Sequence, residues 1–219
     1  MKTDNKWTKK EIALLVSSIF TSIIVGYLCH NDLITIICSV VGISCVLMQA
    51  KGLVLSQFFG LIYVVLYSLI SYKTKYFGEA IVSIFIIMPL FIYGIISWKN
   101  NVDQKISRVK PKYITKTEWI VLISFLILFY ILFYYILKAF NTSQLTISTL
   151  SIIANILSTY LITRRSKFAF IVYMAEDLFQ LSLWSVAVLS DITLIVILIN
   201  PIVYFINDVY AWKSWKKYE

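Results

Sequence analysis

The chain alternates between long apolar runs and short polar breaks, and this pattern defines its predicted elements. The runs are each about as long as the roughly 20 residues that an α-helix needs to cross a bilayer. We predict eight membrane-spanning helices, over residues 12–29, 33–48, 53–72, 78–98, 119–140, 145–162, 168–188 and 193–212. The predicted fold class is therefore an all-α polytopic membrane protein.

The first apolar run follows a basic start, as the core of a secretory signal sequence does. Its length is that of a membrane span, however, and no small-residue cleavage site follows it. We predict that residues 12–29 are retained as an extra helix in front of the others.

Composition supports a membrane protein and argues against other classes. The 219 residues are 60% hydrophobic, whereas soluble domains are roughly half apolar. The net charge of +9 would suit nucleic acid, but the basic residues are spread over the breaks between apolar runs. We therefore expect that the protein lies in the lipid bilayer and that it does not bind nucleic acid. The three cysteines are odd in number and lie in or beside apolar runs, which does not favour a disulfide framework.

The basic residues also predict the orientation of the chain. With eight helices, 17 of the 20 Lys and Arg residues fall on the side that holds both termini. Only Lys73, Lys75 and Lys138 fall on the opposite side. Positive residues concentrate on the cytoplasmic side of a membrane, so the sequence predicts a multi-pass cell-membrane protein with both termini in the cytoplasm.

A weak internal repeat divides the chain. Two predicted triads of helices each carry a proline in the third helix, Pro89 and Pro201, and each ends at a tryptophan, Trp98 and Trp212. One connecting helix between them makes the triads parallel, related by an axis along the membrane normal. Coincidence in an aromatic-rich sequence is the alternative. The predicted organisation is 1–32, tail and extra helix; 33–98, first triad; 99–140, basic linker and connecting helix; 141–219, second triad and tail.

The residues with the clearest candidate chemistry lie in segment 163–184. Phe170, Tyr173, Asp177 and Trp184 follow one another at steps of three, four and seven, so on a helix they share one face. A carboxylate in such a segment is costly unless it faces protein, water or a ligand. Aromatic walls on either side suit a planar, cationic solute. The alternative is a pair of helix-end acids that are hydrated near the interface.

Other aromatic residues and prolines have simpler interpretations. Tryptophans near helix ends commonly anchor a helix at the membrane interface, and this role is predicted for Trp98, Trp119, Trp212 and Trp215. The two helical prolines lack an N–H and are expected to kink their helices.

The chain resembles the PnuC-type vitamin and nucleoside transporters. The residues that carry the resemblance are Phe59-Gly60, Tyr67, 76–79, Pro89 and 94–98 in the first half, and 163–165, Phe170, Tyr173, Asp177, Asn207 and Trp212 in the second. The resemblance covers residues 41 to 217. It implies a SWEET-like three-plus-one-plus-three fold and passive uptake of nicotinamide riboside, with relatives that carry thiamine, riboflavin or deoxynucleosides. It also implies functional coupling to a cytoplasmic kinase, which traps the solute by phosphorylation.

The chain departs from the family pattern where the family binds its substrate. The family commonly has Trp-x-x-Trp-x-x-x-Asn where this chain has Phe170-x-x-Tyr173-x-x-x-Asp177. Two positions that commonly hold an amide hold other residues here, and Asp208 replaces a glycine. Two acids are therefore gained, and Asp177 and Asp208 are able to hydrogen-bond ribose hydroxyls or a base amine.

The predicted solute lies near the bilayer midplane between the two triads, which rock about it and open to one side at a time. The predicted binding residues are Phe170, Tyr173, Asp177, Trp184, Asn207, Gln57, Tyr67 and Asp208. No metal, cofactor or ATP hydrolysis is expected. The one histidine, His30, lies at a helix end, and the chain has no glycine-rich phosphate loop.

Two alternatives belong to other functional classes. An integral-membrane enzyme would use Glu176 and Asp177 as an acid–base pair, but adjacent helical residues point about a quarter-turn apart, which is poor for joint work on one substrate. A structural or sensory protein would use the buried acids only to hold helices together. The sequence leaves open which vitamin or nucleoside is carried, whether protons are coupled through Asp177, and whether the protein is a homo-oligomer.

Overall fold

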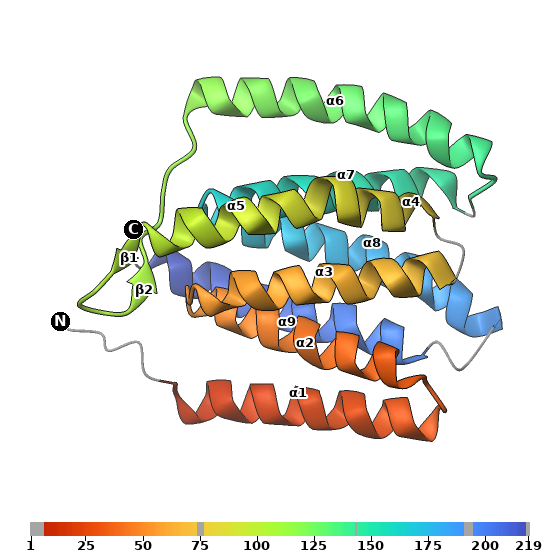
Figure 1. The fold of residues 1–219 in the computed structure, drawn as a ribbon, viewed down its shortest axis with the longest axis horizontal. Coiled ribbons are helices and arrows are strands. Elements are labelled where there is room, and N and C mark those ends of the chain that lie inside the picture. Colours follow the sequence, from red (N-terminus) through yellow and green to blue (C-terminus); the bar gives the residue numbers. More distant parts are fainter. Residues whose placement is uncertain (1–6, 74–76, 143, 191–194, 218–219) are drawn as a thin grey trace.

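The apolar runs fold into long α-helices, as their pattern predicts (Figure 1). The computed structural model describes residues 7–73, 77–142, 144–190 and 195–217. Within these ranges the long helices are α1 (Lys9–Leu28), α2 (Leu33–Ala50), α3 (Leu55–Lys73), an interrupted helix made of α4 (Phe77–Val82), η1 (Ser83–Ile87) and α5 (Met88–Lys99), α6 (Lys116–Ala139), α7 (Leu145–Thr163), α8 (Phe168–Ser190) and α9 (Ile195–Lys216). Tail residues 1–6, Lys75 and Tyr76, which the sequence analysis used, lie outside the described residues.

The eight described helices confirm an all-α membrane protein. Each predicted helix end lies within four residues of the observed one. Among the described residues, six helices, from α1 to α7, are long and apolar enough to cross a membrane. The hydrophobic pattern was a reliable guide because polar residues separate the runs, and at three helix starts the side chain of Thr8, Asp32 or Thr115 accepts a hydrogen bond from a free backbone N–H.

Helix starts are fixed by side chains that cap the backbone. Thr8 and Glu11 form a capping box, in which the Glu11 N–H donates to Thr8 Oγ1 over 3.3 Å and the Thr8 N–H donates to Glu11 Oε2 over 2.6 Å. At α2 the Thr35 N–H donates to Asp32 Oδ1 over 2.8 Å. Hydrogen bonding by Thr35, together with the charge of Lys73 3.6 Å away, holds the pKa of the Asp32 carboxyl below its ordinary value.

The fourth helix is irregular just before Pro89. Residues Ser83–Ile87 form a π-helical turn, in which the Met88 N–H bonds to the carbonyl of Ser83, five residues back. Proline has no N–H to donate to the preceding turn, and a π-turn re-pairs the backbone there. Pro201 likewise lies inside α9.

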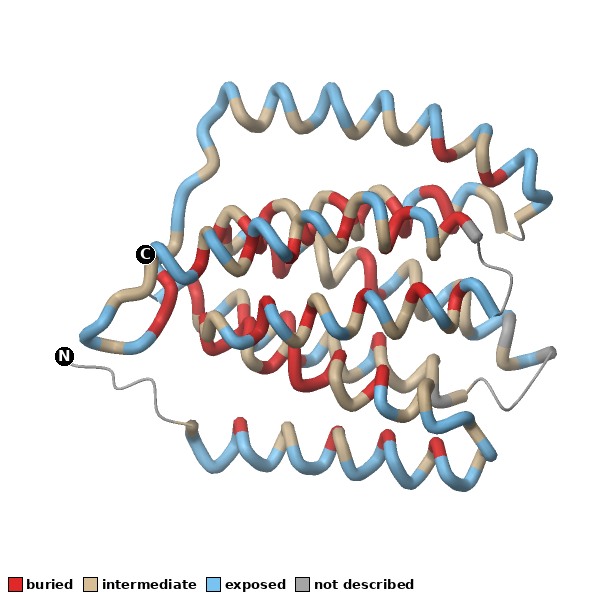
Figure 2. Tube along the Cα trace, in the orientation of Figure 1, coloured by how far each residue is buried: buried red, intermediate tan, exposed pale blue. Residues whose placement is uncertain are grey.

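The helices lie side by side along one axis of the molecule, with α1 at one edge and α6 at the other (Figure 1). α1 packs on α2 and α9, and α6 packs on α7. Buried residues concentrate in the helices between these two, while the outer faces of α1 and α6 are largely exposed (Figure 2). The exposed faces are apolar, as lipid-facing surfaces are. We call the end of the bundle that holds the start of α1 and the end of α9 the terminal end, and the other the far end.

The two edge helices are attached by polar contacts at the terminal end. Lys51 Nζ lies 3.1 Å from Glu11 Oε1, and the Tyr210 hydroxyl donates to the same carboxylate, so α1 is tied to the α2–α3 turn and to α9. Arg164 donates to both oxygens of Glu118 over 2.7 and 3.0 Å and ties α7 to α6. The hydrogen bond with Glu118 raises the pKa of the Arg164 guanidinium above its ordinary value.

The basic linker after α5 contains a short hairpin that the sequence analysis did not predict. Strand β1 (Val102–Asp103) pairs antiparallel with β2 (Arg108–Val109). The Val109 N–H donates to the Gly52 carbonyl over 2.9 Å, and the Lys112 N–H donates to the Arg165 carbonyl over 3.0 Å. The linker therefore bonds to the α2–α3 turn and to the α7–α8 turn across the terminal end.

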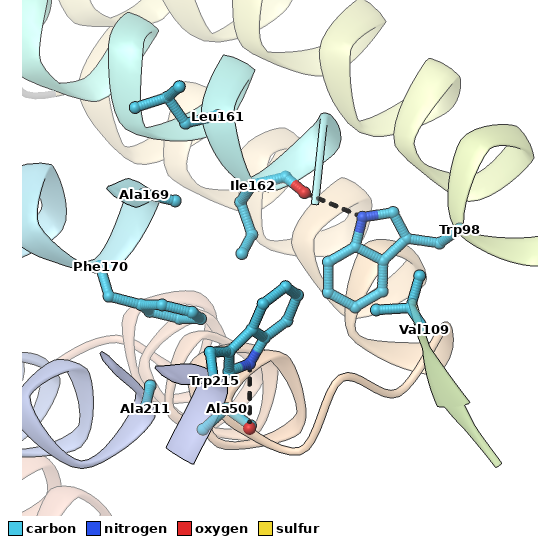
Figure 3. Packing of buried hydrophobic residues seen from close by; sticks show 9 residues of the cluster. All are labelled: Ala50, Trp98, Val109, Leu161, Ile162, Ala169, Phe170, Ala211 and Trp215. Carbon is cyan, nitrogen blue, oxygen red and sulfur yellow. Dashed lines mark hydrogen bonds between the residues drawn. The ribbon is translucent and has the colours of Figure 1, made fainter. Parts of the chain in front are cut away.

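An aromatic cluster fills the terminal end of the bundle, where Trp98, Phe170 and Trp215 are all 0% exposed (Figure 3). The Trp98 indole donates to the Ile162 carbonyl over 2.9 Å. The Trp215 indole lies between the Gln49 and Ala50 carbonyls, at 3.1 and 3.2 Å, and the Phe170 ring packs edge-on against it with 5.3 Å between centroids. The prediction that Trp98 and Trp215 are interfacial anchors is therefore wrong, because both are core residues.

Candidate functional site

A cavity of about 800 Å³ lies inside the bundle. Its walls are formed by α2, α3, the interrupted helix, α7, α8 and α9, and the loop after α6 contributes at the far end. This volume is within the range of pockets that hold small organic molecules, about 300–1,000 Å³.

The cavity is open at the far end and closed at the terminal end. Its far-end wall includes Phe140, 56% exposed, and Val186, 48% exposed. Its deepest wall includes Gln49 and Asp208, each 2% exposed. The backbone carbonyl of Gln49 accepts a hydrogen bond from Trp215, so the floor of the cavity rests on the aromatic cluster.

Aromatic side chains line much of the cavity. Tyr63 and Tyr67 on α3 stack with 5.6 Å between ring centroids. Trp184 on α8 is held by a hydrogen bond from its indole to Gln180 Oε1 over 2.7 Å, and Gln180 in turn donates to Ser151 on α7 over 2.8 Å. These two hydrogen bonds fix the indole relative to the cavity wall. The fixed ring is therefore suited to stack on a planar solute.

Four carboxylates line the same cavity: Glu79, Glu176, Asp177 and Asp208. The described lining contains no Lys, Arg or His. Glu176 accepts hydrogen bonds from Asn155 over 2.7 Å and from Ser158 over 3.1 Å, one to each oxygen. One oxygen of Asp177 is buried and has no hydrogen-bond partner among the described residues.

The structure brings five of the eight predicted binding residues together on the cavity wall. They are Tyr67 from α3, Tyr173, Asp177 and Trp184 from α8, and Asp208 from α9. Four of them come from α8 and α9, which pack directly against each other.

The other three predicted residues, Phe170, Gln57 and Asn207, do not line the cavity. Phe170 belongs to the aromatic cluster at the terminal end. Gln57 is 0% exposed and lies where a Cβ at Gly94 would overlap it, between α3 and α5. The Asn207 amide donates to the Val46 carbonyl over 3.0 Å and so serves the contact of α9 with α2.

Sequence reasoning missed several residues of the wall. Tyr63 precedes Tyr67 by four residues and therefore shares its helix face, a signal that was available. Tyr204 precedes Asp208 by the same interval. Asn155 is a polar residue in the apolar run of α7, but nothing in the sequence links it to Glu176, which is 21 positions further along the chain.

The described residues hold no group of three or more His, Cys, Asp or Glu side chains placed to bind a metal ion. The chemistry that the wall does offer is stacking, hydrogen bonding and attraction of positive charge.

Comparison with known proteins agrees with this architecture. A family described as "Nicotinamide mononucleotide transporter" matches residues 32–217, which is most of the chain. The chain belongs to this family. The match begins at the residue before α2, so α1 lies outside it.

Two relatives and one solved structure are similar over nearly the whole chain. The nicotinamide riboside transporter PnuC of Neisseria mucosa is 23% identical over 96% of this chain and 82% of its own length. The protein of the same name from Haemophilus influenzae is 22% identical, over 96% and 91%. A crystal structure of the vitamin B3 transporter PnuC superposes with a TM-score of 0.82 at 23% identity, covering 97% of this chain and 93% of that one. The chain therefore has a PnuC-like fold.

Proposed function

We propose that the protein is a facilitative transporter that takes up nicotinamide riboside. The observation that carries the proposal is a cavity inside a bundle of membrane-spanning helices, open at one end and closed at the other. Its aromatic and polar walls suit a ribosylated ring, and relatives of the same family are named for this solute. A cytoplasmic kinase would trap the solute after entry.

In the proposed orientation both termini lie in the cytoplasm. The terminal end carries the buried cations Lys51, Arg108 and Arg165 and the partly buried Arg164, as the cytoplasmic side of a membrane protein should. The cavity then opens to the outside, and the aromatic cluster closes the cytoplasmic end. We assign this conformation to the outward-open state of the transport cycle.

Release to the cytoplasm requires the floor of the cavity to open. We propose that α2, α3 and the interrupted helix form one half and α7, α8 and α9 the other, and that the halves rock about the solute. Trp98 from the first half packs against Trp215 from the second, with 5.9 Å between centroids, so this contact must separate on opening. The π-turn before Pro89 and the proline within α9 are the candidate hinges.

Within the cavity, Tyr67, Tyr173 and Trp184 offer aromatic surfaces along the length of the solute, and Asp177 and Asp208 would face the charge of the nicotinamide ring or bind ribose hydroxyls. Gln180 would keep the Trp184 indole in place. No step of this cycle consumes energy, so the direction of transport follows the solute gradient.

Transport by the purified protein is expected to be passive. In proteoliposomes without a kinase, internal nicotinamide riboside should rise to the external concentration and stop there, because the described cavity offers binding and no energy source. Radiolabelled uptake with and without an imposed proton gradient measures this, with protein-free liposomes as the control. Accumulation above the external concentration would contradict passive transport and implicate a cavity carboxylate in proton coupling.

The proposed orientation predicts which positions a membrane-impermeant maleimide reaches in intact cells. In a cysteine-free background, Asn141→Cys at the far end should be labelled from outside, whereas Asp103→Cys in the hairpin should be labelled only after permeabilisation. Both positions are at least partly exposed in the structure, so accessibility itself does not distinguish them. The reverse labelling pattern would place the termini outside and refute the orientation.

A further inference from the structure

We propose that the cavity selects its solute by charge, and that two matched Tyr-x-x-x-Asp pairs on α8 and α9 form a subsite for a positively charged aromatic ring. The pairs are Tyr173 with Asp177 and Tyr204 with Asp208. This inference rests on the proposed function and names the class of solute: an aromatic cation, in preference to a neutral molecule of the same shape.

The two pairs have the same local geometry on neighbouring helices. Residues four apart lie on one face of a helix, one turn above the other, so each tyrosine shares a helix face with its own aspartate. All four side chains line the cavity, and α8 packs directly against α9. Two rings and two carboxylates therefore face the same space, near its closed end.

No Lys, Arg or His among the described lining residues pairs with the acids in this space. Three acids elsewhere in the described chain pair with bases: Glu11 with Lys51 at 3.1 Å, Asp32 with Lys73 at 3.6 Å, and Glu118 with Arg164 at 2.7 Å. The four cavity acids have no ion-pair partner among the described residues. Gathering acids away from water without a cation is unfavourable, and a bound cation offsets that cost.

Asp177, unlike its neighbour Glu176, has a carboxylate oxygen with no hydrogen-bond partner among the described residues. Both oxygens of Glu176 accept hydrogen bonds from α7, so this carboxylate is already satisfied by the protein. Asp177 is 6% exposed, and its Oδ2 atom has no partner among the described residues. A buried acceptor on a cavity wall with no protein partner is an open position for a ligand.

Tyrosine rings strengthen the same preference. The face of an aromatic ring carries negative charge and attracts a cation, more strongly when water is excluded. A pyridinium ring between these tyrosines would gain both stacking and charge attraction, whereas a neutral ring would gain stacking alone.

The experiment compares ligands that differ in charge and little else. Nicotinamide riboside carries a pyridinium, and its reduced 1,4-dihydro form is neutral with the same ribose and carboxamide. Binding of each to the purified protein in detergent is measured by isothermal titration calorimetry. A second pair, 1-methylnicotinamide and nicotinamide, tests charge without the ribose.

We expect the cation of each pair to bind at least about tenfold more tightly than the neutral compound, the factor that corresponds to one contact of about 1.4 kcal/mol. Asp177→Asn keeps the shape and removes the charge, and should reduce this preference to about threefold or less. Asp208→Asn serves as the second variant should Asp177→Asn not fold. The matched control, Asp32→Asn, removes the same charge outside the cavity and should leave the preference unchanged.

The outcomes separate this inference from the proposed function. Equal binding of the charged and neutral compounds in both pairs, or an unchanged preference in both cavity variants, would overturn charge selection. Failure of nicotinamide riboside to bind, together with a clear preference for 1-methylnicotinamide over nicotinamide, would refute the proposed solute and keep the inference.

Discussion

Replacement of Trp215 by alanine is expected to destabilise the folded protein by about 3–5 kcal/mol, the usual cost of truncating a fully buried large aromatic side chain. The side chain is 0% exposed and contacts both Trp98 and Phe170. Its indole N–H also lies within hydrogen-bonding distance of the Gln49 and Ala50 carbonyls. The loss therefore combines a cavity in the aromatic cluster with buried acceptors that lose their donor.

Graded substitutions separate these two contributions. Trp215→Phe keeps a ring and removes the donor, so it should cost about 1–3 kcal/mol. Trp212→Ala on the same helix is the matched control and should cost less than Trp215→Ala, because that side chain is only partly buried. Unfolding in detergent can be followed by the loss of helical circular dichroism on heating, measured in the same way for each variant. Equal melting temperatures for Trp215→Ala and the unmodified protein would show that the cluster does not hold the terminal end together.

The helices could be predicted because a membrane-spanning helix requires a recognisable pattern of apolar and polar residues. Each span needs an apolar run of fixed length, and each end needs polar groups for its free backbone atoms. Thr8, Asp32 and Thr115 provide caps at three such ends. The hairpin was not predicted because its strands are two residues long, and it is held by backbone bonds to Gly52 and Arg165, which are distant in the sequence.

The candidate site was only half predictable, because helical periodicity reports the face of a residue and not its depth. Phe170 and Trp184 lie on one face of α8, but 14 residues separate them, a rise of about 21 Å. That distance places Trp184 on the cavity wall and Phe170 in the closed aromatic cluster. No feature of the sequence shows where along the helix the cavity ends.

The surroundings of tryptophans and amides near helix ends could not be predicted from the sequence either. An anchoring tryptophan and a core tryptophan both appear as aromatic residues beside basic ones, and only the packing of Trp98 against Trp215 distinguishes them. Gln57 and Asn207 likewise read as solute-binding amides, yet each lies in a contact between helices. Which polar side chains face the cavity depends on how neighbouring helices are rotated, and long-range packing sets that rotation.

Replacement of Trp184 by alanine is expected to weaken binding of nicotinamide riboside by about 1–3 kcal/mol, roughly 5-fold to 150-fold, by analogy with the stacking of bases on aromatic side chains. The ring lies on the cavity wall and is oriented by the hydrogen bond to Gln180. Trp184→Phe keeps a stacking surface and loses this bond, so it should bind with intermediate affinity. Tyr173→Phe should cost less, about 0.5–1.5 kcal/mol, because it removes only a hydroxyl.

Two aromatic residues on the same helix show whether the effect belongs to the cavity. Phe179→Ala removes a ring of α8 that does not line the cavity and should leave the dissociation constant unchanged. Phe170→Ala should mainly lower the melting temperature, because that ring packs against Trp215 beneath the cavity floor. Calorimetric titration and thermal unfolding of the same preparations separate affinity from stability. If Trp184→Ala folds normally and binds as tightly as the unmodified protein, Trp184 does not contact the bound solute, and the stacking contact assigned to it is refuted.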